Sequence, residues 1–181
     1  GLQAGTTWIA RTQAGVWQGV LAAFDAGLKP GWIGKSTLGR LQSVVDLARG
    51  RPVRDPWLAG VTSLDALMAL AEESGALEWK AAARLVAKQG ADRLAESLVA
   101  VADPTGAQVK LTTVHQAKGQ TFERVRLGDD LRWDTPDAEE WRINYVALTR
   151  APSLELPEAA LVMLERPPSL EPSPSTDPFD D

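Results

Sequence analysis

The sequence contains no cysteine and only one histidine, His115. Without cysteine the chain forms no disulfide bond and offers no thiolate as a nucleophile or metal ligand. It also lacks any run close to the roughly 18 to 20 apolar residues of a membrane span, and no signal-peptide pattern opens it. We therefore expect a cytoplasmic protein with no membrane partner, and the absence of cysteine is compatible with a reducing compartment.

The chain also has no excess of basic residues. It carries 19 Lys and Arg against 24 Asp and Glu, a net charge of −5. Four of the acids and none of the bases lie in residues 167–181, so residues 1–166 hold 19 basic and 20 acidic side chains, since 24 less 4 is 20. A nearly neutral body permits a local basic track for nucleic acid but does not predict one. Proline, serine and acid dominate residues 167–181, which we expect to be a disordered tail.

A phosphate-binding P-loop is missing as well. Residues 34–37 read GKST, but the motif G-x-x-x-x-G-K-[ST] requires glycine at position 29, where the chain has Lys29. We interpret GKST as a loop and helix start with Ser36 or Thr37 as N-cap. No Walker B stretch, nucleophile elbow, paired carboxylates or metal-ligand spacing is visible. A stand-alone small-molecule enzyme therefore has little support.

What the sequence does contain is an alternation of strand and helix patterns. Residues 6–10 (TTWIA) predict a buried strand, and a helical spacing follows until Gly27. Lysine, proline and glycine at 29–31 predict a turn, and residues 159–164 (AALVML) a last strand. Residues 38–101 show apolar side chains at spacings of three and four, which predicts a set of amphipathic helices. Together these patterns indicate an α/β protein.

The most informative stretch is residues 109–127, in which two strand-like runs flank a polar turn, HQAKG, at 115–119. A strand followed by a polar turn, a short helix and another strand is how α/β sheets present ligand-binding groups. Taken alone, His115 is more often a hydrogen-bonded histidine near a strand end than a functional group. Arg11 alone could be a surface arginine at a strand end, and Arg150 could interact with the dipole at a helix C-terminus.

Three segments resemble conserved motifs of one family. Residues 113–122 (TVHQAKGQTF) are similar to motif V of the UvrD/Rep/PcrA helicases of superfamily 1, and residues 139–151 (EEWRINYVALTRA) to motif VI. Residues 9–14 (IARTQA) resemble motif IV. The three segments occur in the family's order, and together they are a much more specific signal than any one of them.

The resemblance implies the fold of the second RecA-like α/β domain, a parallel-sheet domain of the P-loop NTPase type without a P-loop of its own. Residues 1–37 would be its first part, 38–104 a small helical insertion of the 2B type, 105–166 its second part and 167–181 the tail. The family couples ATP hydrolysis to movement along single-stranded DNA. ATP and Mg²⁺ would be shared with an N-terminal RecA-like half, in cis or in trans, and the chain alone would be inactive as an ATPase.

The resemblance also assigns roles to individual residues. Arg11 and Arg150 would be catalytic, because a planar and permanently charged guanidinium neutralises the charge on a phosphoryl group in transfer. ATP-binding residues would be Arg11, Gly119, Thr121 and Arg150, and DNA-binding residues would be Thr12, Thr113, His115 and Lys118. No metal ligand is expected.

Two positions depart from the family pattern. Ala10 stands where family members often carry an aromatic side chain that holds the adenine, and Thr121 where a glutamate usually holds the ribose. Both departures lie on the nucleotide side, and neither affects the DNA-facing TVH of residues 113–115. They leave open a second hypothesis, an accessory DNA- or protein-binding module without ATPase activity. The basic residues of 49–54 could touch a DNA backbone, although a solvated loop is the simpler interpretation.

Overall fold

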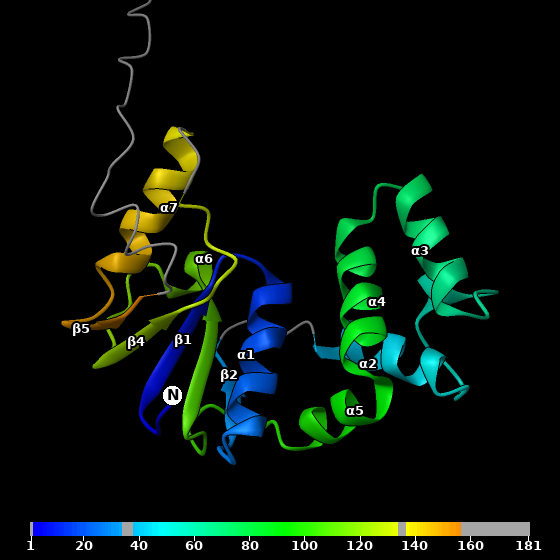
Figure 1. Ribbon diagram of the computed structural model, residues 1–181, viewed down its shortest axis with the longest axis horizontal. Coiled ribbons are helices and arrows are strands. Elements are labelled where there is room, and N and C mark those ends of the chain that lie inside the picture. Colours follow the sequence, from blue (N-terminus) through cyan, green and yellow to red (C-terminus); the bar gives the residue numbers. More distant parts are fainter. Residues whose placement is uncertain (1, 34–37, 134–136, 157–181) are drawn as a thin grey trace, which may run out of the picture.

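The computed structural model describes residues 2–33, 38–133 and 137–156, and within these ranges the chain is an α/β protein (Figure 1). Its sheet has five strands in the order β2-β3-β1-β4-β5, and all of the neighbouring pairs are parallel. The strands are β1 (Thr6–Ala10), β2 (Pro30–Trp32), β3 (Val109–Thr113), β4 (Arg124–Leu127) and β5 (Ser153–Glu155). The α/β class predicted from the sequence is therefore confirmed.

The helices cover both faces of this sheet and form a separate group beside it (Figure 1). They are α1 (Gln13–Asp25), α2 (Leu38–Ala48), α3 (Leu64–Glu73), α4 (Leu77–Gln89), α5 (Ala91–Val99), α6 (Val114–Ala117) and α7 (Ala138–Leu148), with a short 3₁₀ turn, η1 (Pro56–Leu58), before α3. The helix pattern predicted for residues 38–101 is confirmed in α2 to α5, which all lie between β2 and β3.

Alternate residues of the central strand β1 belong to two different cores. Trp8 and Ala10 point to the face covered by α1 and join the larger cluster, which continues into α2 to α5. Ile9 points to the opposite face and packs with residues of α6, β4 and α7, including Val125 and Ile143. Both faces of β1 are fully buried, which explains why its sequence is an uninterrupted apolar and β-branched run rather than an alternating one.

The helical group is held together by aromatic and ionic contacts of its own. Trp57 and Trp79 stack with their ring centroids 4.9 Å apart, and the Arg40 guanidinium lies 5.2 Å from the Trp79 ring. Arg40 also pairs with Glu78 of α4 and approaches Gln13 of α1, with 3.5 Å between its Nη1 and the amide oxygen. These contacts fix α4 beside the N-terminus of α1, next to the sheet.

One sequence-based expectation needs correction. The turn expected at 29–31 is wrong, because Pro30–Trp32 forms strand β2. Proline is tolerated there since it is the first residue of a strand at the edge of the sheet. Helix α7 ends at Leu148, and β5 is the last strand among the described residues. Residues 159–164, the GKST segment with Ser36 and Thr37, and the tail at 167–181 lie outside the described residues.

None of the described helices is long and apolar enough to cross a bilayer.

Candidate functional site

The polar residues singled out in the sequence gather at the carboxyl edge of the sheet. Arg11 follows β1, Thr113 ends β3, and Asp130 comes just after β4. Since β1 lies between β3 and β4 and all three run parallel, their carboxyl ends meet at one edge. In open α/β sheets this edge is where ligands bind.

Asp130 organises the start of α1. One of its carboxylate oxygens accepts from the Arg11 amide at 3.0 Å, and the other accepts from the Thr12 amide at 2.7 Å and the Thr12 hydroxyl at 2.6 Å. Thr12 is also the N-cap of α1, and its hydroxyl oxygen accepts from the Gly15 amide at 3.1 Å. The donor that Thr12 was expected to offer to DNA is therefore already used inside the protein.

Arg11 is held by a carboxylate as well. Its Nε donates to Glu140 Oε2 at 2.7 Å, and its Nη2 donates to the second oxygen, so the pair is bidentate. Glu140 lies in the first turn of α7 and is only 4% exposed. The hydrogen bond from Arg11 holds the pKa of the Glu140 carboxyl below its usual value, against the opposing effect of burial. The same pair raises the pKa of Arg11.

The TVH segment leaves more of its hydrogen-bonding capacity open. Thr113 is the N-cap of α6, and its hydroxyl oxygen accepts from the Gln116 amide at 3.4 Å. Its hydroxyl hydrogen has no acceptor among the described residues. His115 and Lys118 are exposed and make no ion pair in the described part of the chain. Each of these three residues can therefore donate a hydrogen bond or place a positive charge toward a ligand.

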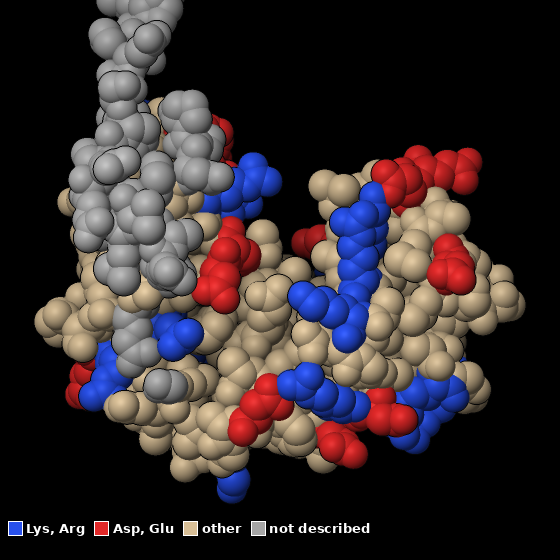
Figure 2. Space-filling model, in the orientation of Figure 1, with Lys and Arg blue, Asp and Glu red and all other residues tan. Residues whose placement is uncertain are grey.

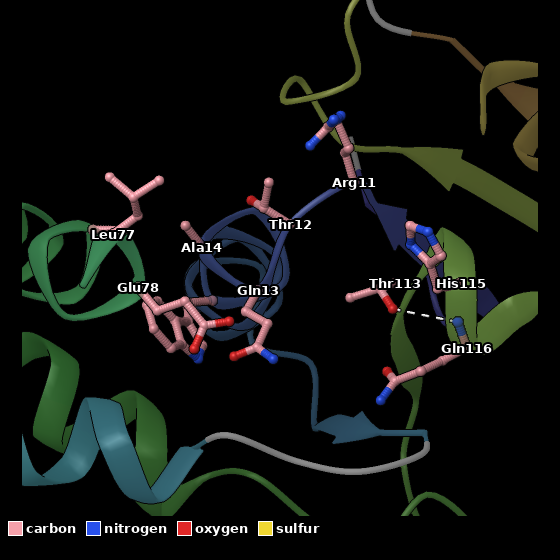
Figure 3. Close-up of a pocket in the computed structure, with 11 residues that line it drawn as sticks. Arg11, Thr12, Gln13, Ala14, Leu77, Glu78, Thr113, His115 and Gln116 are labelled. Carbon is pink, nitrogen blue, oxygen red and sulfur yellow. Dashed lines mark hydrogen bonds between the residues drawn. The ribbon is translucent and has the colours of Figure 1, made fainter. Parts of the chain in front are cut away.

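A cavity of about 550 Å³ opens beside these residues (Figure 3). Figure 3 shows Arg11, Thr113 and His115 on one side of it and Leu77 and Glu78 of α4 on the other. Its floor and walls are completed by residues of α1, α4 and α6, namely Thr12, Gln13, Ala14, Trp17, Ala81 and Gln116. The cavity is thus shared by the sheet edge and the helical group, and its volume is in the range of ligand sites.

Arg150 lies elsewhere, after the C-terminus of α7. Its Nε donates to the Val146 carbonyl at 2.8 Å, its Nη1 to the Gln120 carbonyl at 3.3 Å and its Nη2 to the Thr149 hydroxyl at 2.8 Å. All three acceptors are neutral. Within the described residues no carboxylate pairs with Arg150, so none of these residues neutralises its positive charge.

Gly119 and Thr121 flank Gln120 and therefore lie on the Arg150 side. Gly119 has φ of 80°, and a β-carbon there would meet no atom within 4 Å, so the loop is open at this point. Thr121 is exposed and lines a second cavity of about 440 Å³ at the amino edge of the sheet. Ala10, by contrast, is fully buried in the core beneath α1. A side chain at position 10 has no access to a nucleotide.

Arg11 and Arg150, predicted to act on one phosphoryl group, are not brought together. Their partners Glu140 and Val146 are six residues apart on α7, which is roughly 9 Å along the helix axis at 1.5 Å per residue. The two guanidinium groups share no partner among the described residues, and of the two only Arg11 lines the cavity of Figure 3.

Three contributors to this region could not be found by sequence reasoning. Asp130 was visible only as part of a polar loop, and Glu140 only as one of two adjacent acids. Leu77 was one apolar residue among many in a helical pattern. The sole signal for Glu140 was its place in the segment that resembles motif VI. None of the described residues forms a group of three or more His, Asp or Glu side chains able to hold a metal ion.

Comparison with protein-family models finds no match for this chain, and comparison with curated proteins finds none either.

Proposed function

We propose that this chain is the second RecA-like half of a UvrD-type superfamily 1 DNA helicase. In this proposal it binds single-stranded DNA along the carboxyl edge of its sheet and lends Arg150 to an ATP molecule held by a separate first half. The three motif-like segments are the starting point, and the five-stranded parallel sheet with helices on both faces is consistent with a RecA-like domain.

One observation supports the proposal most directly. Thr113 and His115, from the segment resembling motif V, line a cavity together with Arg11, from the segment resembling motif IV. The two segments are about a hundred residues apart in the sequence and meet because β1 and β3 pair in register, Ala10 opposite Thr113. Hydroxyl and imidazole donors suit phosphate oxygens, which accept hydrogen bonds without regard to base sequence.

The two arginines take different roles in this proposal. Arg11 is neutralised by Glu140 and lies at the strand-binding cavity, so its role is to tie β1 to α7 and to shape that cavity. Among the described residues Arg150 bonds neutral acceptors and pairs with no carboxylate, and so it suits a developing anion. We therefore assign the nucleotide-directed role to Arg150 and no longer to Arg11.

The nucleotide and its Mg²⁺ would be held mainly by the first half. ATP would supply the phosphoryl group and Mg²⁺ the charge that bridges its oxygens. This chain would contribute Arg150 and the open backbone at Gly119 and Thr121. Because the described residues contain neither a P-loop nor a metal-binding cluster, hydrolysis by this chain alone is not expected.

Single-strand binding by the isolated chain tests the proposal. The affinity for a fluorescent oligothymidylate can be measured by anisotropy for the wild type and for Thr113→Val combined with His115→Ala. We expect the double variant to bind at least tenfold more weakly, since two phosphate contacts are lost. The exposed Tyr145 lies on α7 rather than at the cavity, so Tyr145→Ala serves as the control. Equal affinity of all three proteins would refute the strand-binding role.

The second hypothesis, an accessory module without ATPase activity, is supported by the two departures at the proposed nucleotide side. Ala10 is buried and has no aromatic ring for an adenine, and Thr121 offers a hydroxyl where a carboxylate would hold the ribose. Such a module would bind single-stranded DNA through the same cavity and would give no ATP hydrolysis when mixed with a first half.

A further inference from the structure

The helical group presents one face of α4 to the strand-binding cavity. Leu77 and Ala81 line the cavity, and Leu77 is 73% exposed, which is unusual for a large apolar side chain. Arg84 and Lys88 follow on the same helix face, because the spacings of four, three and four residues return to one side of a helix. Both are exposed, and neither makes an ion pair with another described residue.

The two cations form a short track that leads away from the cavity. Arg84 and Lys88 are four residues apart, or about 6 Å along the helix axis. Figure 2 shows Lys and Arg side chains grouped over α4, beside the hollow that separates it from the sheet. Positive charges repeated at this interval along one side of a groove suit successive phosphates of a nucleic acid strand.

The α4 side of the cavity, opposite Thr113 and His115, suits a neutral planar group better than a phosphate. Glu78 lies on this side, and Arg40, the cation that pairs with it, does not line the cavity. A phosphate bound on this side would therefore face the Glu78 carboxylate. Apolar walls and uncharged hydrogen-bonding groups remain.

Trp17 adds a donor to this environment. It lines the cavity, is 1% exposed, and its indole Nε1 has no hydrogen-bond partner in the described part of the chain. A buried N–H without a partner costs free energy, which an acceptor on a bound ligand would recover. Nucleobases carry such acceptors at their edges and present flat apolar faces to side chains like Leu77.

We propose that α4 is the second wall of a single-strand groove, in which one base enters the cavity between Leu77, Ala81 and Trp17 while Arg84 and Lys88 hold neighbouring phosphates. This inference rests on the proposed function and extends it, because it assigns strand binding to the helical group as well as to the sheet. An acidic peptide would also meet the two cations, but it would not use the apolar surface of Leu77 and Ala81 beside them.

The phosphate track is tested by the salt dependence of binding. The affinity of the full chain for an oligothymidylate of about 16 nucleotides, within the range of single-strand site sizes, is measured between low and moderate salt. Removing two phosphate contacts should lower the slope of log affinity against log salt by about 1.4, at about 0.7 per contact. We expect this change for Arg84→Gln combined with Lys88→Gln.

Arg51→Gln combined with Arg54→Gln is the matched control. It removes the same charge from exposed positions in the loop before η1, away from the cavity. An unchanged salt slope for the α4 variant would overturn the proposal. An equal reduction of the slope in both double variants would overturn it as well. A polyglutamate peptide that competes as well as the oligonucleotide would also overturn it.

The base-binding cavity is tested with an abasic strand of the same length. The wild type should bind the oligothymidylate about tenfold more tightly than the abasic strand, since stacking is lost without bases. Ala81→Leu fills the cavity and should remove that preference, whereas Ala87→Leu, exposed on another side of the same helix, should keep it. Equal binding of both strands by the wild type would overturn this assignment.

The results also distinguish the α4 groove from the proposed single-strand function on which it rests. If the wild type binds neither strand, the single-strand function and the α4 groove fail together. If Thr113→Val with His115→Ala weakens binding while the α4 variants do not, only the α4 groove fails.

Discussion

Arg11 and Glu140, 129 residues apart in the sequence, form a bidentate ion pair that joins the end of the central strand to the first turn of α7. The pair links the segment resembling motif IV to the segment resembling motif VI. It also separates the two arginines that were expected to act together, because Arg11 is held at the first turn of α7 and Arg150 lies after its last turn. The proposed strand side and the proposed nucleotide side therefore lie at opposite ends of α7.

Loss of the Glu140 carboxylate should destabilise the protein. Glu140→Ala leaves the Arg11 guanidinium without its partner, and breaking a buried pair costs about 3–5 kcal/mol. The Arg11 side chain is 28% exposed, so solvation by water offsets part of this cost. We expect the free energy of unfolding, measured by urea denaturation, to fall by about 2–3 kcal/mol. Glu139→Ala, at the exposed neighbouring position, should change it by less than about 0.5 kcal/mol. Equal effects at the two positions would contradict the importance of the pair.

The same pair predicts a dependence of stability on pH. The pKa of Glu140 is lowered in the folded protein, chiefly by the hydrogen bond from Arg11. The stabilisation is therefore fully present above the unfolded-state value of about 4.3 and is lost as pH falls through the lower folded-state pKa. The difference in unfolding free energy between wild type and Glu140→Gln should be constant from pH 6 to 8 and shrink below about pH 4. A difference that stays constant down to pH 3 would show that Glu140 does not titrate in this way.

Much of the fold could be predicted from the sequence because it depends on local patterns. The buried run of β1 and the three-and-four spacing of α2 to α5 determine those elements directly. Strand β2 was missed because its three residues begin with Pro30, which reads as a turn until its partner β3 is known. Sheet pairing is set by contacts between distant residues, and no local pattern reports them.

The site was predictable only in part for the same reason. The TVH segment and Arg11 could be singled out by motif, and they do line one cavity. The use of the Thr12 donor by Asp130 could not be foreseen, since the two residues are 118 positions apart. The contribution of α4 was also invisible, because Leu77 reaches the cavity only through the packing of the helical group on α1.

Gly15 should be essential for the geometry at the start of α1. A β-carbon at this position would overlap the carboxylate of Asp130, which holds Arg11 and Thr12 in place. Gly15→Ala should therefore lower the unfolding free energy by about 1–3 kcal/mol, as expected for overpacking, despite the better helix propensity of alanine. In α2, Gly39 has open space around its Cβ position, so Gly39→Ala should be neutral or stabilising. Thermal unfolding of both variants measures the difference, and the reverse order would contradict the close approach of Asp130.

Lys118 should contribute one phosphate contact beside the TVH segment. It is exposed, follows α6 and makes no ion pair among the described residues. Lys118→Gln should lower the salt slope for oligothymidylate binding by about 0.7 and leave the unfolding free energy nearly unchanged. Lys110→Gln, at an exposed position near the amino edge of the sheet, is the comparison. A slope equal to that of the wild type would remove Lys118 from the strand site.

The most direct test is ATP hydrolysis in the presence of single-stranded DNA, measured for this chain alone, for a first RecA-like half bearing the Walker motifs alone, and for the two mixed. We predict strand-stimulated hydrolysis only in the mixture, with a loss of about 10³-fold or more for Arg150→Ala, as for other arginine fingers. Arg11→Ala should mainly weaken strand binding and lower the stability of the chain, rather than act on the hydrolysis step. Hydrolysis by this chain alone, or a mixture with Arg150→Ala that works at the full rate, would contradict the proposal that the chain is half of a two-part motor.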